Sequence, residues 1–133
     1  MSADGMSDVD WPGVIAGIEA VGIVELNATR ILVRKAMALL LQIRGWPEHP
    51  DRAAWAIALG GTLADLTIRL TPSMRPRLDL DALYQRARGQ VAGVALDGQL
   101  PRPFPLRCPF SLDDLLHGDR TQLDGLLAPN EEL

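Results

Sequence analysis

The sequence has few of the residues on which enzyme chemistry depends. Its 133 residues include two histidines and a single cysteine, Cys108, and they contain no recognisable catalytic or nucleotide-binding motif. A lone cysteine cannot form an internal disulfide, so the sequence does not indicate an oxidising compartment. Cys108 is interpreted as a small buried apolar group rather than a nucleophile. We therefore expect no cofactor and no catalytic residue, and the sequence favours a protein that is not an enzyme.

Aromatic residues and long apolar runs are also scarce. Aromatics make up 5% of the chain against 47% hydrophobic residues, a mixture that suits helix-on-helix packing better than a β-sandwich. The first ten residues are acidic and have no apolar stretch, which excludes an ordinary secretion signal. The uncharged part of the most apolar segment is too short to cross a bilayer. These absences predict a bacterial cytoplasmic protein without a membrane segment.

The strongest positive feature is the segment Ile31–Ile43, ILVRKAMALLLQI. Residues 36–41 are apolar on every side of a helix, and a helix without a polar face must be enclosed by other helices. The chain has the length of one domain with a single core. We therefore expect residues 36–41 to form the middle of a central buried helix.

Four main helices are predicted from the apolar spacing and the capping residues. They are expected from Asp10 to about Gly22, at residues 23–44 and 51–70, and from Asp79 to near Asp97. Asp10 is a suitable N-cap for the first helix, and Gly22 is expected to end or bend it.

Two adjacent glycines, Gly60 and Gly61, stand in the middle of the third predicted helix. Each glycine there costs about 1 kcal/mol relative to alanine. We therefore expect another helix to approach closely at this point, near Ala36–Ala38.

The C-terminal part begins with a proline-rich strap, residues 100–109, which carries four prolines. Proline excludes regular helix, so an extended path over the surface is expected, with Phe104 and Phe110 as apolar anchors. Ser111 and Asp114 then have the spacing of a capping box at the start of a short helix. Beyond this helix, the leucines of residues 123–127 are expected to dock only weakly.

These patterns together predict an all-α fold, a compact helical bundle of four main helices plus a short C-terminal helix after the strap. Residues 1–9 are predicted to be a flexible N-terminal tail and residues 10–117 a single helical-bundle domain. Residues 118–133 are predicted to be a loosely docked acidic C-terminal tail.

Several short motifs resemble those of a known family. The most specific is Cys108-Pro109-Phe110-Ser111-Leu112, followed by Leu115. The other landmarks are Asp10-Trp11, Leu39-Leu40-Leu41, Trp46, Trp55, Thr71-Pro72-Ser73-Met74-Arg75, Tyr84-Gln85-Arg86-Ala87-Arg88 and Phe104-Pro105. Over residues 10–116 the chain resembles the bacterial domain of unknown function family number twenty-nine. The resemblance implies a compact all-helical fold, and it implies no activity and no catalytic residues.

One group of residues has the spacing of a weak metal site. Asp113, Asp114 and His117 fall on one face of the short C-terminal helix, where two carboxylates and an imidazole could bind a metal or act as a general base. Such a site would need further ligands, for example Glu19 or His49. The simpler interpretation is an exposed helix end with His117 near the negative end of the helix dipole.

A second group consists of arginines. Arg75, Arg77, Arg86 and Arg88 could form a basic patch beside Tyr84, and nucleic-acid binding requires such charge next to aromatic platforms. The net charge of −4 and the presence of only one tyrosine argue against nucleic acid.

Two tryptophans, Trp11 and Trp46, lie near the ends of predicted helices and could anchor an interface or equally cover a small core. The abundant apolar residues and the scarcity of reactive ones favour a non-enzymatic module that binds another protein or a second copy of itself. A nucleic-acid-associated regulator that uses the arginine patch is the alternative, and a metal-dependent enzyme is the third hypothesis. No small-molecule ligand is identifiable.

Overall fold

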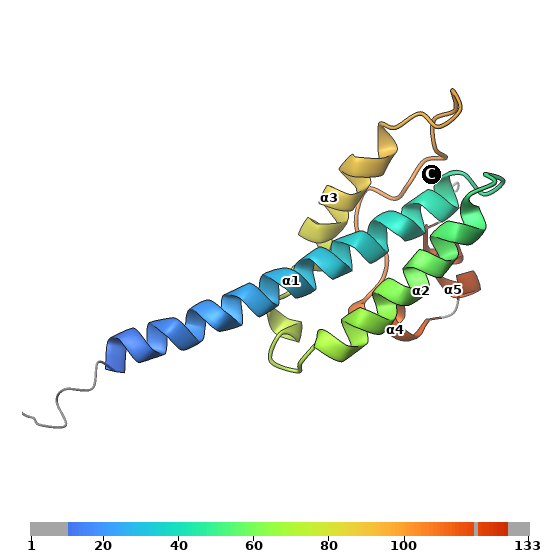
Figure 1. The fold of residues 1–133 in the computed structure, drawn as a ribbon. Helices are drawn as coiled ribbons and strands as arrows, with labels where there is room; N and C mark the ends of the chain where they lie inside the picture. The colour runs from blue at the N-terminus through green and yellow to red at the C-terminus, as the bar shows by residue number, and fades with distance from the viewer. Residues whose placement is uncertain (1–10, 119, 128–133) are drawn as a thin grey trace, which may run out of the picture.

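The computed structural model describes the backbone of residues 11–118 and 120–127, and the side chains of residues 22–118, 122, 123 and 125–127. Within these residues the chain is helical, and the only β-type pairing is a single bridge between Leu96 and Gln99. The predicted all-α fold is therefore confirmed (Figure 1). The elements are α1 (Trp11–Gly45), α2 (Arg52–Arg69), the 3-10 turn η2 (Arg75–Arg77), α3 (Leu80–Ala92), α4 (Leu112–His117) and α5 (Arg120–Leu127).

The two N-terminal helices predicted from the sequence are one continuous helix, α1. The prediction that Gly22 ends a helix is wrong, because a glycine within a strong apolar period lowers helix stability by only about 1 kcal/mol. The bundle therefore has three long helices and two short ones within the described residues, instead of four long and one short. The predicted N-cap Asp10 and the predicted tail of residues 1–9 lie outside the described residues.

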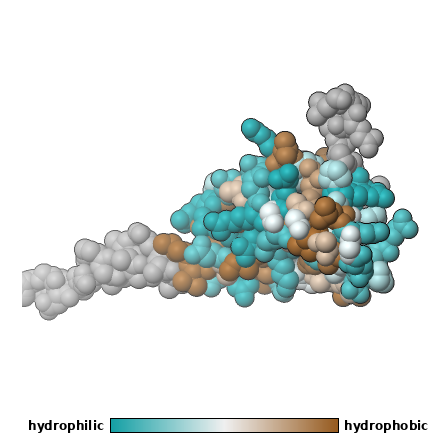
Figure 2. Space-filling view, turned by 90° about the horizontal axis from the view of Figure 1, so that it is seen from above, coloured by the Kyte–Doolittle hydropathy of each residue, from teal (hydrophilic) through white to brown (hydrophobic). Residues whose placement is uncertain are grey.

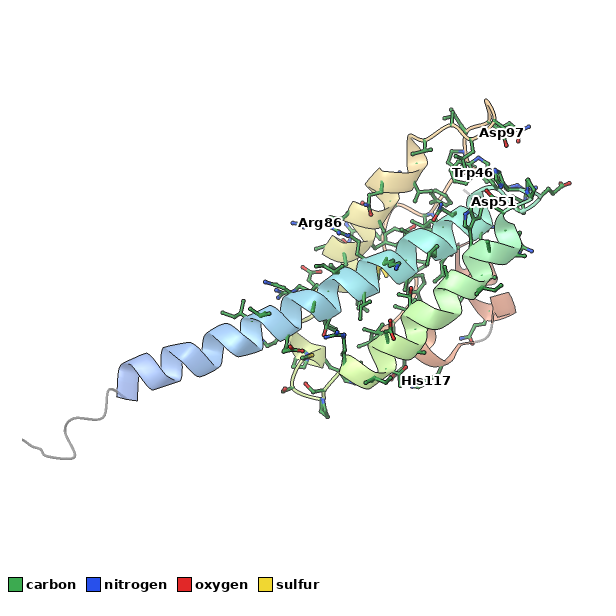
Figure 3. All side chains as sticks on the ribbon, viewed as in Figure 1. Trp46, Asp51, Arg86, Asp97 and His117 are labelled. Carbon is green, nitrogen blue, oxygen red and sulfur yellow. The ribbon has the colours of Figure 1, made fainter. Side chains whose placement is uncertain are left out.

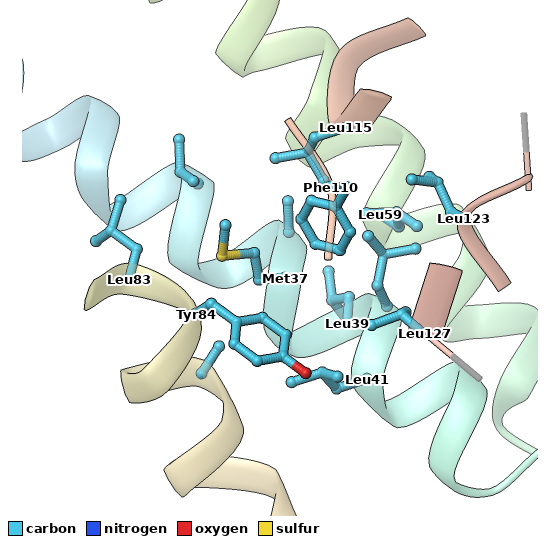
Figure 4. Packing of buried hydrophobic residues seen from close by; sticks show 14 of the residues in the cluster. Met37, Leu39, Leu41, Leu59, Leu83, Tyr84, Phe110, Leu115, Leu123 and Leu127 are labelled. Carbon is cyan, nitrogen blue, oxygen red and sulfur yellow. The ribbon is translucent and has the colours of Figure 1, made fainter. Parts of the chain in front are cut away.

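The central segment of α1 is enclosed, as predicted. Met37 and Leu41 are fully inaccessible to solvent and Leu40 is almost so. Side chains from α2, α3, the strap and the two short helices cover this segment, among them Leu59, Tyr84 and Leu115 (Figure 4). Residues 36–41 therefore form the middle of the core.

The outer face of α2 carries the two adjacent glycines. Gly60 and Gly61 are exposed, and a Cβ built on either would meet no other atom within 4 Å. The close helix approach predicted there is therefore wrong. The face of α2 that packs on α1 contains Leu59, Thr62 and Leu66, and the two glycines fall on the opposite face of the helix.

The C-terminal helices contribute to the core. Ser111 accepts a hydrogen bond from the Asp114 backbone N–H, and the Asp114 carboxylate accepts one from the Ser111 N–H, so the predicted capping box of α4 is present. In α5, Leu123 and Leu127 are buried in the same cluster as the centre of α1. This helix lies within the segment predicted to be a loosely docked tail, and its two leucines are fully part of the core.

Candidate functional site

Residues of several landmark motifs hold the proline-rich strap against α3. The Tyr84 hydroxyl donates a hydrogen bond of 2.7 Å to the Pro105 carbonyl oxygen, and the Gln85 side-chain amide donates one to the Leu106 carbonyl. From the most specific motif, the Cys108 backbone N–H donates to the Asp81 carboxylate over 3.0 Å. These landmark residues therefore have a structural role between α3 and the strap.

Cys108 has the environment of a structural thiol. Its Sγ donates to the Phe110 carbonyl oxygen over 3.3 Å. Burial raises the pKa of the Cys108 thiol, and the nearby Asp81 carboxylate raises it further, although the hydrogen bond to Phe110 acts in the opposite direction. Because the thiolate is the nucleophile, this environment opposes nucleophilic chemistry.

Burial also raises the pKa of Tyr84 to about 12, against the lowering effect of the Arg88 guanidinium. In the unfolded chain the phenol loses its proton near pH 10, and in the folded chain it keeps it to about pH 12. The free energy of unfolding should therefore fall by about 2 kcal/mol as the pH rises from about 10 to about 12. Below about pH 10, Tyr84 should not make the free energy of unfolding depend on pH.

The Tyr84→Phe variant tests this assignment. It should lower the free energy of unfolding by about 1 kcal/mol at neutral pH, because the Pro105 carbonyl loses its donor. It should also lose part of the fall in stability above about pH 10. Urea titrations at neutral pH and at about pH 11 measure both effects. Equal slopes of stability against pH in the two proteins would show that Tyr84 titrates normally.

The predicted metal-site residues have other partners. The Asp113 carboxylate forms an ion pair of 2.9 Å with Arg75, and the Asp114 carboxylate is used in the capping box. His117 lies at the C-terminal end of α2, whereas His49 lies beyond the other end of that helix (Figure 3). No group of three or more potential metal ligands is found among the described residues.

Trp46 belongs to the core. Its side chain is 5% exposed, and its indole N–H donates to the Gln99 carbonyl oxygen over 2.9 Å. Of the two interpretations left open by the sequence, the structure supports a lid over the core and not an exposed anchor. His49 stacks on Trp55 nearby, with ring centroids 4.8 Å apart, and its Nε2 lies 3.3 Å from Asp97. The side chain of Trp11 lies outside the described residues.

Two of the four candidate arginines have identifiable surroundings. Arg75 is paired with Asp113, and the Nε of Arg88 is buried without a hydrogen-bond partner. Tyr84 is fully buried, so it cannot stack on a base. The structure instead combines Arg86 with two arginines of α1 that the sequence pattern did not single out.

These arginines line a groove between α1 and the start of α3, with a volume of about 410 Å³. We call it the arginine groove, and its lining residues are Asn27, Arg30, Ile31, Arg34, Asp79, Ala82, Leu83 and Arg86. Arg30 is held in place, since it donates to the Asn27 side chain over 2.8 Å and to the Arg77 carbonyl over 3.2 Å. The helical spacing of residues 27, 30, 31 and 34 places them on one face, but the contribution of α3 depends on tertiary packing.

The N-terminal half of α1 extends beyond the other helices (Figure 1). We call residues 11–24 the N-terminal arm. At its base, Ile23 and Val24 are 47% and 64% exposed, and Ile31 in the arginine groove is 55% exposed. Apolar atoms are visible on the surface where the arm leaves the body (Figure 2). The only charged residue in the arm is Glu19.

The fold and this surface define a small all-helical domain with a helical extension and a strap that is hydrogen-bonded to α3. A solved structure with this fold is that of an α-helical protein of unknown function from Rhodospirillum rubrum. It is 25% identical, with a TM-score of 0.79 over 96% of this chain and 83% of that chain. The family model described as "Domain of unknown function DUF29" matches residues 1–120, so the chain belongs to this family and the resemblance is confirmed. No curated protein matches the chain.

The family and the solved neighbour are both described as of unknown function, so neither assigns an activity. Among the helices of the described part, none combines the length and apolar character needed to cross a membrane.

Proposed function

We propose that this protein is a non-enzymatic, cytoplasmic protein–protein interaction module whose docking surface is the N-terminal arm of α1. The observation that carries the proposal is the arm itself, a helix that extends past its own bundle and carries one charge in residues 11–24. Ile23 and Val24, at its base, are exposed to solvent in the isolated molecule.

Two physical arguments support an interaction role. A helical segment as short as the arm has marginal stability in water without tertiary contacts, because most helical stability in proteins comes from packing an apolar face. A helix that lacks a wide polar face is normally covered, and contiguous exposed apolar surface is typical of interaction sites. A bound protein would provide the missing cover.

The Val24→Glu variant of the full chain tests the proposal, with Ile57→Glu as a matched control. Ile57 is an equally apolar residue, 77% exposed on α2, outside the proposed surface. Co-purification from native cells with quantitative mass spectrometry should recover a stoichiometric protein with the unmodified chain and with Ile57→Glu. Val24→Glu should lose at least about nine-tenths of it, because a desolvated charge costs several kcal/mol. Equal recovery with all three proteins would overturn the proposal.

A further inference from the structure

We infer that the partner of the arm is a second copy of this chain, and that the two α1 helices pack antiparallel. In this arrangement the acidic segment that precedes α1 in one copy lies on the arginine groove of the other. This inference rests on the proposed function, because it assigns the occupant of the same surface.

The charge pattern along the first 35 residues supports an antiparallel arrangement. Three aspartates, Asp4, Asp8 and Asp10, precede the arm, and the basic residues Arg30, Arg34 and Lys35 follow it. Glu25 lies between the arm and the basic residues, and it forms an ion pair of 3.6 Å with Arg69 of α2. Parallel packing would place the aspartates of both copies together and the basic residues of both copies together. Antiparallel packing places each acidic segment beside the basic segment of the other copy, which is the attractive combination.

The dimensions of α1 are compatible with this pairing. Each residue advances a helix by about 1.5 Å, so Arg30 lies about 28 Å along the axis from Trp11. If the two helices cross at residue 20, Asp10 of one copy is level with Arg30 of the other, because each is ten residues from the crossing point. In this register the two arms run past each other, and the sequence between Asp10 and Arg30 carries only two charges, Glu19 and Glu25.

The arginine groove has the chemistry that an acidic segment requires. It contains three guanidinium groups and one carboxylate, in a chain whose net charge is −4. Within the described part of the chain, Arg34 and Arg86 form no ion pair, and Arg30 is oriented by Asn27 and the Arg77 carbonyl. Ile31 and Leu83 supply an apolar floor that continues into Ile23 and Val24. The apolar and charged parts of the surface are therefore one continuous strip.

Sedimentation and light scattering of the full chain test the inference. The unmodified chain and Ile57→Glu should have twice the monomer mass at micromolar concentration and low salt, and the dimer should weaken as salt is added. Val24→Glu should be monomeric. Circular dichroism should show unchanged helix content in the body, since Val24 and Ile57 are both exposed.

Charge reversal separates this dimer from other arrangements. The pair Asp4→Arg and Asp8→Arg should weaken dimerisation by about tenfold, and so should the pair Arg34→Glu and Arg86→Glu. A chain that carries all four changes should regain most of the affinity, because both charge signs are exchanged. Failure of the combined chain to recover would exclude contact between the acidic segment and the groove.

The other outcomes distinguish this inference from the proposed function. If the unmodified chain is monomeric but Val24→Glu loses a different protein from cells, the second copy is wrong and the interaction role stands. If Val24→Glu changes neither measurement, both are wrong. Flotation of the unmodified chain with phosphatidylcholine vesicles, lost in Val24→Glu, would instead identify a lipid surface as the occupant.

Discussion

Replacement of Leu41 by alanine should lower the free energy of unfolding by about 3 kcal/mol. Leu41 is fully buried in the centre of α1, where it packs near Tyr84 of α3 (Figure 4). Removing three carbon atoms there loses their transfer free energy and leaves a cavity that neighbours from several elements cannot close together. Urea titration monitored by tryptophan fluorescence measures the change.

Leu106→Ala is the matched control for this experiment. Leu106 lies on the strap and is 72% exposed, so the same substitution should change stability by less than about 0.5 kcal/mol. Equal effects at the two positions would show that the middle of α1 is not enclosed, and would contradict the fold described above.

Substitution of two glycines by alanine should have effects of opposite sign. A Cβ at Gly45 would lie 2.7 Å from the Cβ of Pro101 and 2.9 Å from the Phe104 ring. These contacts are too short, so the strap must shift away from the end of α1, and Gly45→Ala should cost about 2 kcal/mol. At Gly61 a Cβ meets nothing within 4 Å, so Gly61→Ala should raise the free energy of unfolding by about 1 kcal/mol.

The two glycine variants test two different surfaces with the same substitution: Gly45→Ala tests the packing of the strap, and Gly61→Ala tests the outer face of α2. The same urea titration measures both, and the sign of the change in the free energy of unfolding distinguishes them. A stabilising Gly45→Ala would mean that residues 101–104 do not lie against the end of α1. A destabilising Gly61→Ala would mean that the outer face of α2 is covered.

Local patterns in the sequence were sufficient for much of the fold. The apolar segment 36–41 predicts its own burial, because no orientation of that helix has a polar face. The caps at Asp79 and Ser111 depend on side chains and backbone groups three residues apart, so their hydrogen bonds are fixed by local geometry.

Features that depend on helix orientation could not be predicted in this way. Glycine permits close approach and so favours a contact at Gly60 and Gly61, but which side of α2 packs on α1 is decided by the larger residues Leu59 and Leu66. The position of Trp46 in the sequence fits an anchor and a lid equally well, and the hydrogen bond from its indole to the Gln99 carbonyl, 53 positions away, distinguishes them.

The candidate site was only partly predictable for the same reason. Arg86 was identified, but its neighbours Arg30 and Arg34 come from α1, more than fifty positions earlier in the chain. Their meeting depends on how α1 and α3 pack, which no local pattern encodes. The carboxylates of the weak metal candidates Asp113 and Asp114 are used by Arg75 and by the capping box, and the Arg75 contact joins residues too far apart in the sequence to be predicted from spacing.

The order of the elements along the chain has a consequence during synthesis on the ribosome. The centre of α1 is translated before Phe110, Leu115 and Leu127, which help to cover it. A nascent chain therefore carries an incompletely covered apolar helix until these residues emerge, and such intermediates are prone to aggregate or to recruit chaperones.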